Sequence, residues 1–231
     1  EMGSVWSRLG SEVHVVEFLD HITPGMDKEI SKEFMKILKK QGINFHLQHK
    51  VEKVTKNNTG VIVSTSNKEG NKKNFECEVV LISVGRKPNT DGLNLEKIGV
   101  ELDNKKRIKT NESFKTNLED IYAIGDSINA WDMPKSGFAA NSQSKILARN
   151  LINKIFDKEY ITPVFLNTCY SFSAPNRAFS ISSWYRLNSD KNRIVSLGSN
   201  ESNLKASSEE RMKESLQAFG WYKSLIKEIY G

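Results

Sequence analysis

Cysteine is scarce in this sequence of 231 residues, which contains only Cys77 and Cys169. Two isolated cysteines cannot build a disulfide framework, and they lack the paired spacing of a structural zinc site. No run of about 18 apolar residues is present, so we expect no membrane-spanning helix. Residues 1–10 do not show a basic segment followed by an apolar one, so they do not resemble a signal peptide.

Histidine is absent from most of the chain. The four histidines are His14, His21, His46 and His49. A reaction that needs a histidine base in the second half is therefore excluded for these residues. The net charge is +6, but lysine is spread along the whole sequence. A nucleic-acid-binding protein gathers such charge on one face or helix, so we expect solvated surfaces and no nucleic-acid partner.

The first half alternates between helix and strand patterns. A helix is predicted over 1–9, a strand over 12–18 and a helix that Asp27 caps. The apolar positions of that second helix are spaced i, i+4, i+7 and i+8, at Ile30, Phe34, Ile37 and Leu38. Further strands are predicted over 43–48, 51–54, 60–65 and 75–84. This order predicts an α/β dinucleotide-binding unit with an inserted β-meander.

Two acidic residues follow short apolar strands. Glu17 ends the strand over 12–18, where an acid can hold the adenosine ribose and repel a 2′-phosphate, favouring NAD over NADP. Many strands end in an acid, so an ordinary solvated strand end is the alternative for Glu17. The segment 121–126 is predicted to be a strand that runs directly into Gly125 and Asp126.

The second half predicts a small α/β arrangement. A helix is expected over 137–156, and strands over 165–170, 179–186 and 193–197. Ser207 and Glu210 have the spacing of a capping box before a last helix. That helix carries an apolar stripe of Met212, Leu216, Phe219, Leu225, Ile226 and Ile229. We expect the stripe to dock on a core, and a partner surface is the alternative.

The first 126 residues resemble dihydrolipoamide dehydrogenase, a pyridine nucleotide–disulfide oxidoreductase that uses FAD and NAD. The residues that carry the resemblance are Glu1–Gly10, Val15–Asp20, Pro24–Asp27, Lys36–Gly42, Val84–Thr90, Gly99–Asp103 and Ile121–Asp126. The resemblance implies that Glu17 holds the NAD ribose and that Gly85 lies beside the nicotinamide dinucleotide. It also implies that Asp126 accepts a hydrogen bond from the FAD ribitol chain, with Gly125 leaving room for the cofactor. The paired cysteines and the histidine base of that family are not found at the corresponding places.

Residues 126–231 resemble instead the flavoprotein subunit of flavocytochrome c sulfide dehydrogenase. The segments that carry this second resemblance are Met133–Gln143, Asn167–Ser171 and Trp221–Gly231. The resemblance implies that Cys169 pairs with an upstream cysteine beside the flavin, in segments that this chain lacks. It also implies that the loop with Pro134 and Lys135 passes the isoalloxazine ring.

Each of these sites also has a purely structural interpretation. Cys169 can be a buried structural thiol, the commonest fate of a single cysteine. Met133–Gly137 can be only a turn that starts a helix, since proline, serine and glycine are ordinary turn residues. Cys77 lies between two glutamates in a strand pattern, where a solvent-side or edge position is expected rather than a redox role.

We therefore predict a partial two-dinucleotide-binding-domain flavoprotein. The predicted division is an NAD-binding domain over 1–118, a return segment of the FAD-binding domain over 119–160 and a sulfide-dehydrogenase-like domain over 161–231. The predicted function is FAD-dependent oxidoreduction of the pyridine nucleotide–disulfide type, with the chain not active alone. The alternative is a truncated or hybrid non-catalytic chain, joined at Gly125-Asp126, that packs or binds nucleotide weakly.

The expected partners follow from the two resemblances. They are a small sulfur substrate and either a cytochrome c subunit or a second copy of the chain. The first resemblance implies a cytoplasmic location and the second a periplasmic one.

Overall fold

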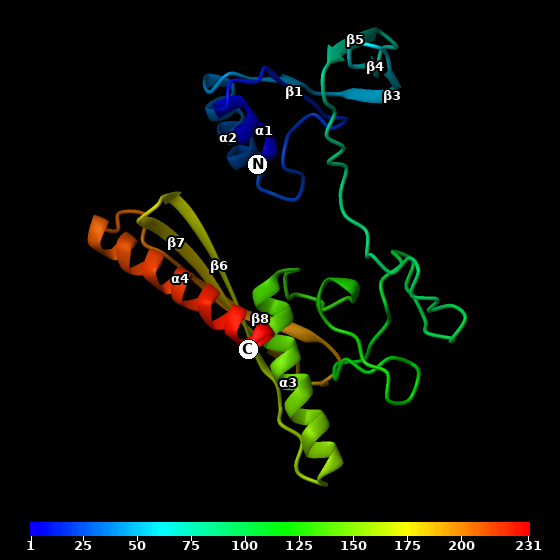
Figure 1. Ribbon diagram of the computed structural model, residues 1–231, viewed down its shortest axis with the longest axis vertical. Helices are drawn as coiled ribbons and strands as arrows, with labels where there is room; N and C mark the ends of the chain where they lie inside the picture. The colour runs from blue at the N-terminus through cyan, green and yellow to red at the C-terminus, as the bar shows by residue number, and fades with distance from the viewer. The chain divides into compact units, whose positions relative to one another are not determined.

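The computed structural model describes residues 1–231, and it confirms a mixed α/β protein. The chain forms two compact units, Glu1–Val84 and Gly85–Gly231, which are described separately below (Figure 1). The predicted division at residues 118 and 160 concerns the domains of the parent families, and it stays a prediction. None of the helices is long and apolar enough to cross a membrane.

The first unit contains two small sheets and two helices. Its elements are α1 (Met2–Arg8), β1 (Val13–Val16), α2 (Lys28–Lys40), β2 (Ile43–His46), β3 (His49–Lys56), β4 (Val61–Asn67) and β5 (Lys72–Cys77). Strands β1 and β2 pair in parallel, with Val13 opposite Ile43. Strands β3, β4 and β5 form an antiparallel meander. The predicted order of strand, helix, parallel strand and meander is therefore confirmed, although the last strand differs in its extent.

Helix α2 begins as the sequence predicts, because the Asp27 carboxylate accepts hydrogen bonds from the backbone N–H groups of Glu29 and Ile30. Its apolar face is not buried, however. Ile30, Phe34 and Ile37 are exposed, and the fully buried residue of the helix is Ser31. Ser31 lies against the loop before the helix, where its hydroxyl donates to the backbone oxygen of Ile22. The spacing thus predicted the helix correctly but not the side that packs.

The strand predicted over 75–84 is too long. Strand β5 ends at Cys77, which lies opposite Val61, the first residue of β4. Beyond Cys77 no neighbouring strand is available to accept ladder hydrogen bonds. Val79, Ile82 and Val84 consequently stay exposed in irregular backbone.

A hydrogen-bonded histidine pair joins β1 to β2. His14 Nδ1 lies 3.0 Å from His46 Nε2, and the other ring nitrogen of His14 lies 3.1 Å from Glu12 Oε1. The Lys73 ammonium of β5 is 3.4 Å from His46 Nδ1. Burial and the positive charge of Lys73 lower the pKa of His46, with smaller contributions from His14 and His49. The neutral imidazole of His46 is therefore the form that the fold favours.

This histidine pair makes the stability of the first unit depend on pH. Because the pKa of His46 is lower in the folded state, the unfolded chain binds the proton first, from its ordinary value of 6.5 downward. We expect the free energy of unfolding to be intact above about pH 7 and to fall as the pH drops through the range below 6.5. Urea unfolding of His46→Gln should show a weaker pH dependence. His21→Gln, which alters a histidine paired with Asp20, is the control, and an equal loss of pH dependence there would contradict this explanation.

The second unit begins with a long irregular segment and ends in a sheet covered by helices. Its elements are η1 (Gly125–Ser127), α3 (Gly137–Ile155), β6 (Val164–Ala174), β7 (Arg177–Leu187), β8 (Ile194–Glu201) and α4 (Ser208–Tyr230). Strands β6, β7 and β8 form one antiparallel sheet in chain order. Helix α3 packs against β6 and helix α4 against β7 (Figure 1). The three strands and both helices predicted here are confirmed.

The core of the second unit is built mainly from the irregular segment and the sheet. Phe114 and Phe165 meet edge to face at its centre, with ring centroids 5.6 Å apart. The other buried members of this core cluster are Val100, Ile108, Ile128, Met133, Ala139, Tyr185 and Ile194. The cluster holds Ile128 and Met133 in place, and these residues flank the candidate site described below.

The strand predicted over 121–126 is not formed. The segment makes one isolated bridge, from Tyr122 to Lys115, and Ile108 bridges Ile128 just beyond it. A strand needs a continuous neighbour, and here only single residues lie opposite the segment. The turn at Gly125–Asp126 is nevertheless present, as the short helix η1.

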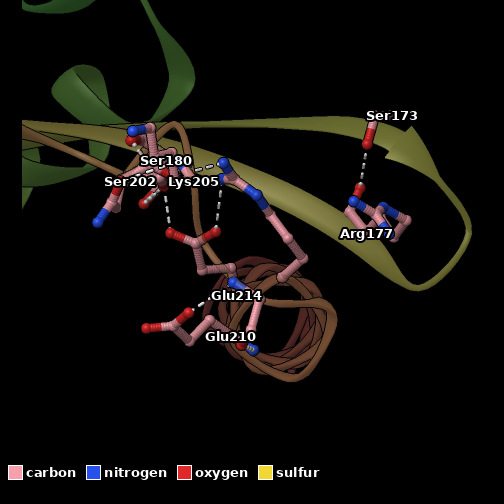
Figure 2. Close-up of polar contacts among 10 residues, drawn as sticks. Ser173, Arg177, Ser180, Ser202, Lys205, Glu210 and Glu214 are labelled. Carbon is pink, nitrogen blue, oxygen red and sulfur yellow. Dashed lines mark hydrogen bonds and ion pairs between the residues drawn. The ribbon is translucent and has the colours of Figure 1, made fainter.

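Helix α4 is attached to the end of the sheet through the partly buried carboxylate of Glu214, which also forms an ion pair within the helix. Glu214 binds Arg211 at 3.2 Å and accepts a hydrogen bond from Ser202, which also binds the backbone of Ser180 (Figure 2). The predicted capping box of Ser207 and Glu210 is confirmed at the start of the helix.

The predicted apolar stripe of α4 is mostly exposed. The residues of α4 that are fully buried are Ser215 and Ala218, whereas Leu216 and Phe219, one position later, are exposed. Small side chains allow the helix to approach β7 closely, so the packed face is rotated by one residue from the predicted one. The docking expected for the stripe is therefore wrong for most of its residues.

Candidate functional site

The turn at Gly125 requires glycine for a local reason. Its φ is +73°, in the left-handed region where a side chain is strained. A Cβ added there would lie 3.4 Å from the Cβ of Ala140. The backbone N–H of Gly125 donates to Gln143 Oε1 at 2.8 Å, which ties the turn to α3.

Asp126 presents an accessible carboxylate. Its side chain is 43% exposed, and Arg86 Nη2 lies 3.3 Å from Oδ2. Arg86 is itself 85% exposed, so this ion pair contributes only about 0–1 kcal/mol and can be displaced. Lys135 donates from Nζ to the backbone oxygen of Asp126. The carboxylate can therefore accept hydrogen bonds from a ligand hydroxyl, with two cationic side chains close by.

The loop before α3 is fixed at both ends. Gln143 is 1% exposed, and its Nε2 lies 3.7 Å from the Sδ of Met133 while its Oε1 holds Gly125. Asp132 binds Arg193 at 2.7 Å and accepts from the backbone of Ser196. These two contacts lower the pKa of Asp132, so it remains an anion that ties the loop to β8.

A short chain of hydrogen bonds connects this loop to Cys169. Ser136 caps α3 by accepting from the backbone N–H of Ala139, and its hydroxyl donates to Asn167 Oδ1 at 2.5 Å. Asn167 is 4% exposed, and its Nδ2 lies 3.6 Å from the Sγ of Cys169. Cys169 itself is an exposed free thiol. The interpretation of Cys169 as a buried structural thiol is therefore wrong.

The structure brings most of the predicted site residues into one region of the second unit. Gly125 and Asp126 adjoin Lys135, which follows the exposed Pro134, and Ser136 connects that loop to Cys169. Gly85 precedes Arg86, which contacts Asp126, and it has a φ of +123° with open space beside it.

Glu17 lies in the first unit, directly after β1. Its Oε1 accepts a hydrogen bond from the backbone N–H of Leu19 at 2.9 Å. The backbone of Glu17 forms hydrogen bonds with the backbones of His46 and His49, which fix the position of the residue at the end of the strand. Cys77 is also in this unit, at the end of the edge strand β5, where it is partly buried.

Sequence reasoning missed four residues of the candidate site: Arg86, Ser136, Gln143 and Asn167. Ser136 could have been found, because a serine immediately before an apolar helix is a typical N-cap. Asn167 stands two residues before Cys169 in a strand, and that spacing puts both on one face. Nothing in the local sequence indicates the partners of Arg86 and Gln143.

The matches to family models define the class of protein to which the chain belongs. The family model described as pyridine nucleotide-disulphide oxidoreductase matches residues 1–145. This is more than half of the chain, which therefore belongs to that family. A second model, described as flavocytochrome c sulphide dehydrogenase, flavin-binding, matches residues 161–230. Both predicted families are confirmed, and the first implies FAD and NAD as cofactors. The predicted change at residue 126 is too early, because the first model extends to residue 145 and includes Met133–Gln143.

Several curated relatives resemble only part of the chain. A mitochondrial dihydrolipoyl dehydrogenase of Pisum sativum is 52% identical over 129 residues, which is 55% of this chain and 26% of that protein. A leghemoglobin reductase of Glycine max is 51% identical over 129 residues, or 55% of this chain and 25% of the relative. The matched part of the chain thus spans about a quarter of the length of these relatives.

Solved structures agree with the fold. The HOCl-induced flavoprotein disulfide reductase RclA of Escherichia coli, in its Cu(II) complex, aligns with a TM-score of 0.60 and 20% identity. The alignment covers 78% of this chain and 38% of RclA. LpdA from Mycobacterium tuberculosis aligns with a TM-score of 0.57 and 21% identity, over 79% and 37% of the two chains. The predicted partial flavoprotein fold is therefore confirmed.

The left-handed turn gives a test of the site geometry. We expect Gly125→Ala to destabilise the second unit by about 1–2 kcal/mol, because alanine is strained at positive φ. Gly137→Ala is the matched control, since Gly137 begins α3 without positive φ and has open space beside it. That control should be neutral or slightly stabilising. Chemical unfolding of both variants measures the difference, and equal stabilities would contradict the assignment.

Proposed function

We propose that the chain is part of an FAD-dependent oxidoreductase that takes electrons from a small sulfur substrate through Cys169. The observation that carries the proposal is the hydrogen-bonded connection from the loop at Lys135 and Ser136 to Asn167 and Cys169. This connection joins residues that match one flavoprotein family to residues that match another. The activity of the whole protein is inferred, because these residues span a minor part of their relatives.

The polar groups at the turn fit FAD. Asp126 would accept a hydrogen bond from a hydroxyl of the ribitol chain, and Gly125 has no side chain that would obstruct the cofactor. Lys135 and the amino-terminal end of α3 supply positive charge on the same loop. Bound FAD would supply a two-electron acceptor for the sulfur centre.

The first unit supports NAD as the nucleotide partner. Glu17 holds its carboxylate at the end of β1, and one of its oxygens is oriented by the Leu19 amide. The second oxygen is then available for the ribose hydroxyls of a nucleotide.

The sulfur step needs a second cysteine outside these 231 residues. Cys169 would form a disulfide with that cysteine, and hydrosulfide would attack it. One S–S bond breaks and a new one forms between the attacking sulfur and one cysteine, while the other cysteine leaves as a thiolate. The exposure of Cys169 gives a small nucleophile access. Dihydrolipoamide chemistry is not proposed, because no histidine follows His49 in this chain.

The electron acceptor beyond FAD is proposed to be a cytochrome c subunit, as the match over 161–230 suggests. Such a partner would place the protein in the periplasm. The second candidate function is a hybrid chain without catalysis. Its support is the change of matching family between residues 145 and 161.

Titration of FAD into the purified chain tests the proposal. We expect saturable binding, followed by flavin fluorescence, and an affinity reduced about tenfold or more in Asp126→Ala, the size of a hydrogen bond to a charged group. Asp190→Ala alters an exposed turn carboxylate and should leave the affinity unchanged. A chain that binds no FAD would overturn the proposal in favour of the non-catalytic hybrid.

A further inference from the structure

Asn167 and Cys169 lie on the same face of the sheet in the second unit. They are two residues apart in β6, where alternate side chains point to the same side. The intervening Thr168 points to the other face, where its hydroxyl binds Ser182 of β7. The two side chains differ sharply in burial, since Asn167 is 4% exposed whereas Cys169 is exposed to solvent.

The amide of Asn167 is held in one orientation. The Ser136 hydroxyl accepts from the backbone N–H of Ala139 and directs its own hydrogen to Asn167 Oδ1, at 2.5 Å. The amide oxygen is thereby occupied, and the amide nitrogen faces the Sγ of Cys169 at 3.6 Å. Backbone pairing of Asn167 with Ser183 fixes the strand itself. A buried amide nitrogen is a donor that cannot accept, so it favours an anionic sulfur over a neutral thiol.

We propose that Asn167 is a positioning residue, which aims the sulfur of Cys169 and stabilises its thiolate through a hydrogen bond that Ser136 orients. This inference rests on the proposed function, because it assigns Cys169 a reaction as a nucleophile or leaving group. It adds a role that family membership alone does not give. The Ser136 hydroxyl both caps α3 and orients the amide that contacts the sulfur. A thiolate is the form that attacks, and a stabilised thiolate also leaves a disulfide more readily.

The rate of alkylation of Cys169 by iodoacetamide tests this role without any cofactor. The experiment uses the full chain with Cys77→Ser, so that one thiol remains. Asn167→Asp keeps the oxygen that Ser136 binds but replaces the donor with a second oxygen. We expect the rate at neutral pH to fall at least about two- to tenfold, because one hydrogen bond is lost and the new carboxylate repels the thiolate. The midpoint of the pH–rate profile should move to higher pH.

Two further variants separate positioning from general structural damage. Ser136→Ala leaves Asn167 in place but removes the hydroxyl that orients it, so it should move the profile in the same direction by a smaller amount. Ser182→Ala removes the hydroxyl contact of Thr168 on the opposite face and should leave the profile unchanged. Thermal unfolding of each variant identifies any that fail to fold. If Asn167→Asp does not fold, the pH–rate profile of Ser136→Ala tests the inference.

An unchanged profile in both Asn167→Asp and Ser136→Ala would overturn the inference. This outcome is independent of FAD titration, which tests the proposed function. A shifted profile in a chain that binds no FAD would keep the positioning role and reject the flavoprotein function. Normal FAD binding with an unshifted profile would keep the flavoprotein function and reject the positioning role.

Discussion

The buried amide of Gln143 is the contact on which the candidate site depends. Its oxygen holds the Gly125 turn and its nitrogen contacts Met133, so one side chain of α3 fixes both the turn and the loop that precedes the helix. A buried amide left without these partners would cost about 1–3 kcal/mol. Because Met133 also belongs to the core cluster around Phe114 and Phe165, the geometry of the site is inherited from hydrophobic packing. Asp126 and Lys135 themselves contribute little to that packing, and they stay accessible.

Local sequence patterns predicted the regular elements of the fold well. Asp27 and the capping box at Ser207 identified helix starts, and the β-meander followed from alternating residues. The predictions failed where a neighbour was required. The extension of β5 beyond Cys77 and the strand before Gly125 lack a partner, and the apolar faces of α2 and α4 are not the faces that pack. Periodicity fixes which residues share a face, but tertiary contacts decide which face is buried.

The sequence predicted the main residues of the candidate site but not the residues that connect them. Motifs indicated Asp126, Lys135 and Cys169, and the structure places the first two together and links the third to them. The linking residues are joined across long separations: 18 residues for Gly125 and Gln143, 31 for Ser136 and Asn167, and 40 for Arg86 and Asp126. A single sequence contains no signal for such pairs, because each partner looks like an ordinary polar residue in its own segment.

The double role of Ser136 restricts which amino acids its position can accept. A helix start by itself tolerates serine, threonine, aspartate or asparagine, since each can accept a hydrogen bond from the first turn. The bond to Asn167 Oδ1 requires a donor as well. Only serine and threonine supply both functions through one hydroxyl, whereas an ionised aspartate would set two oxygens against each other. Substitution at this position is therefore constrained by its neighbour on β6 more narrowly than the rules for helices would allow.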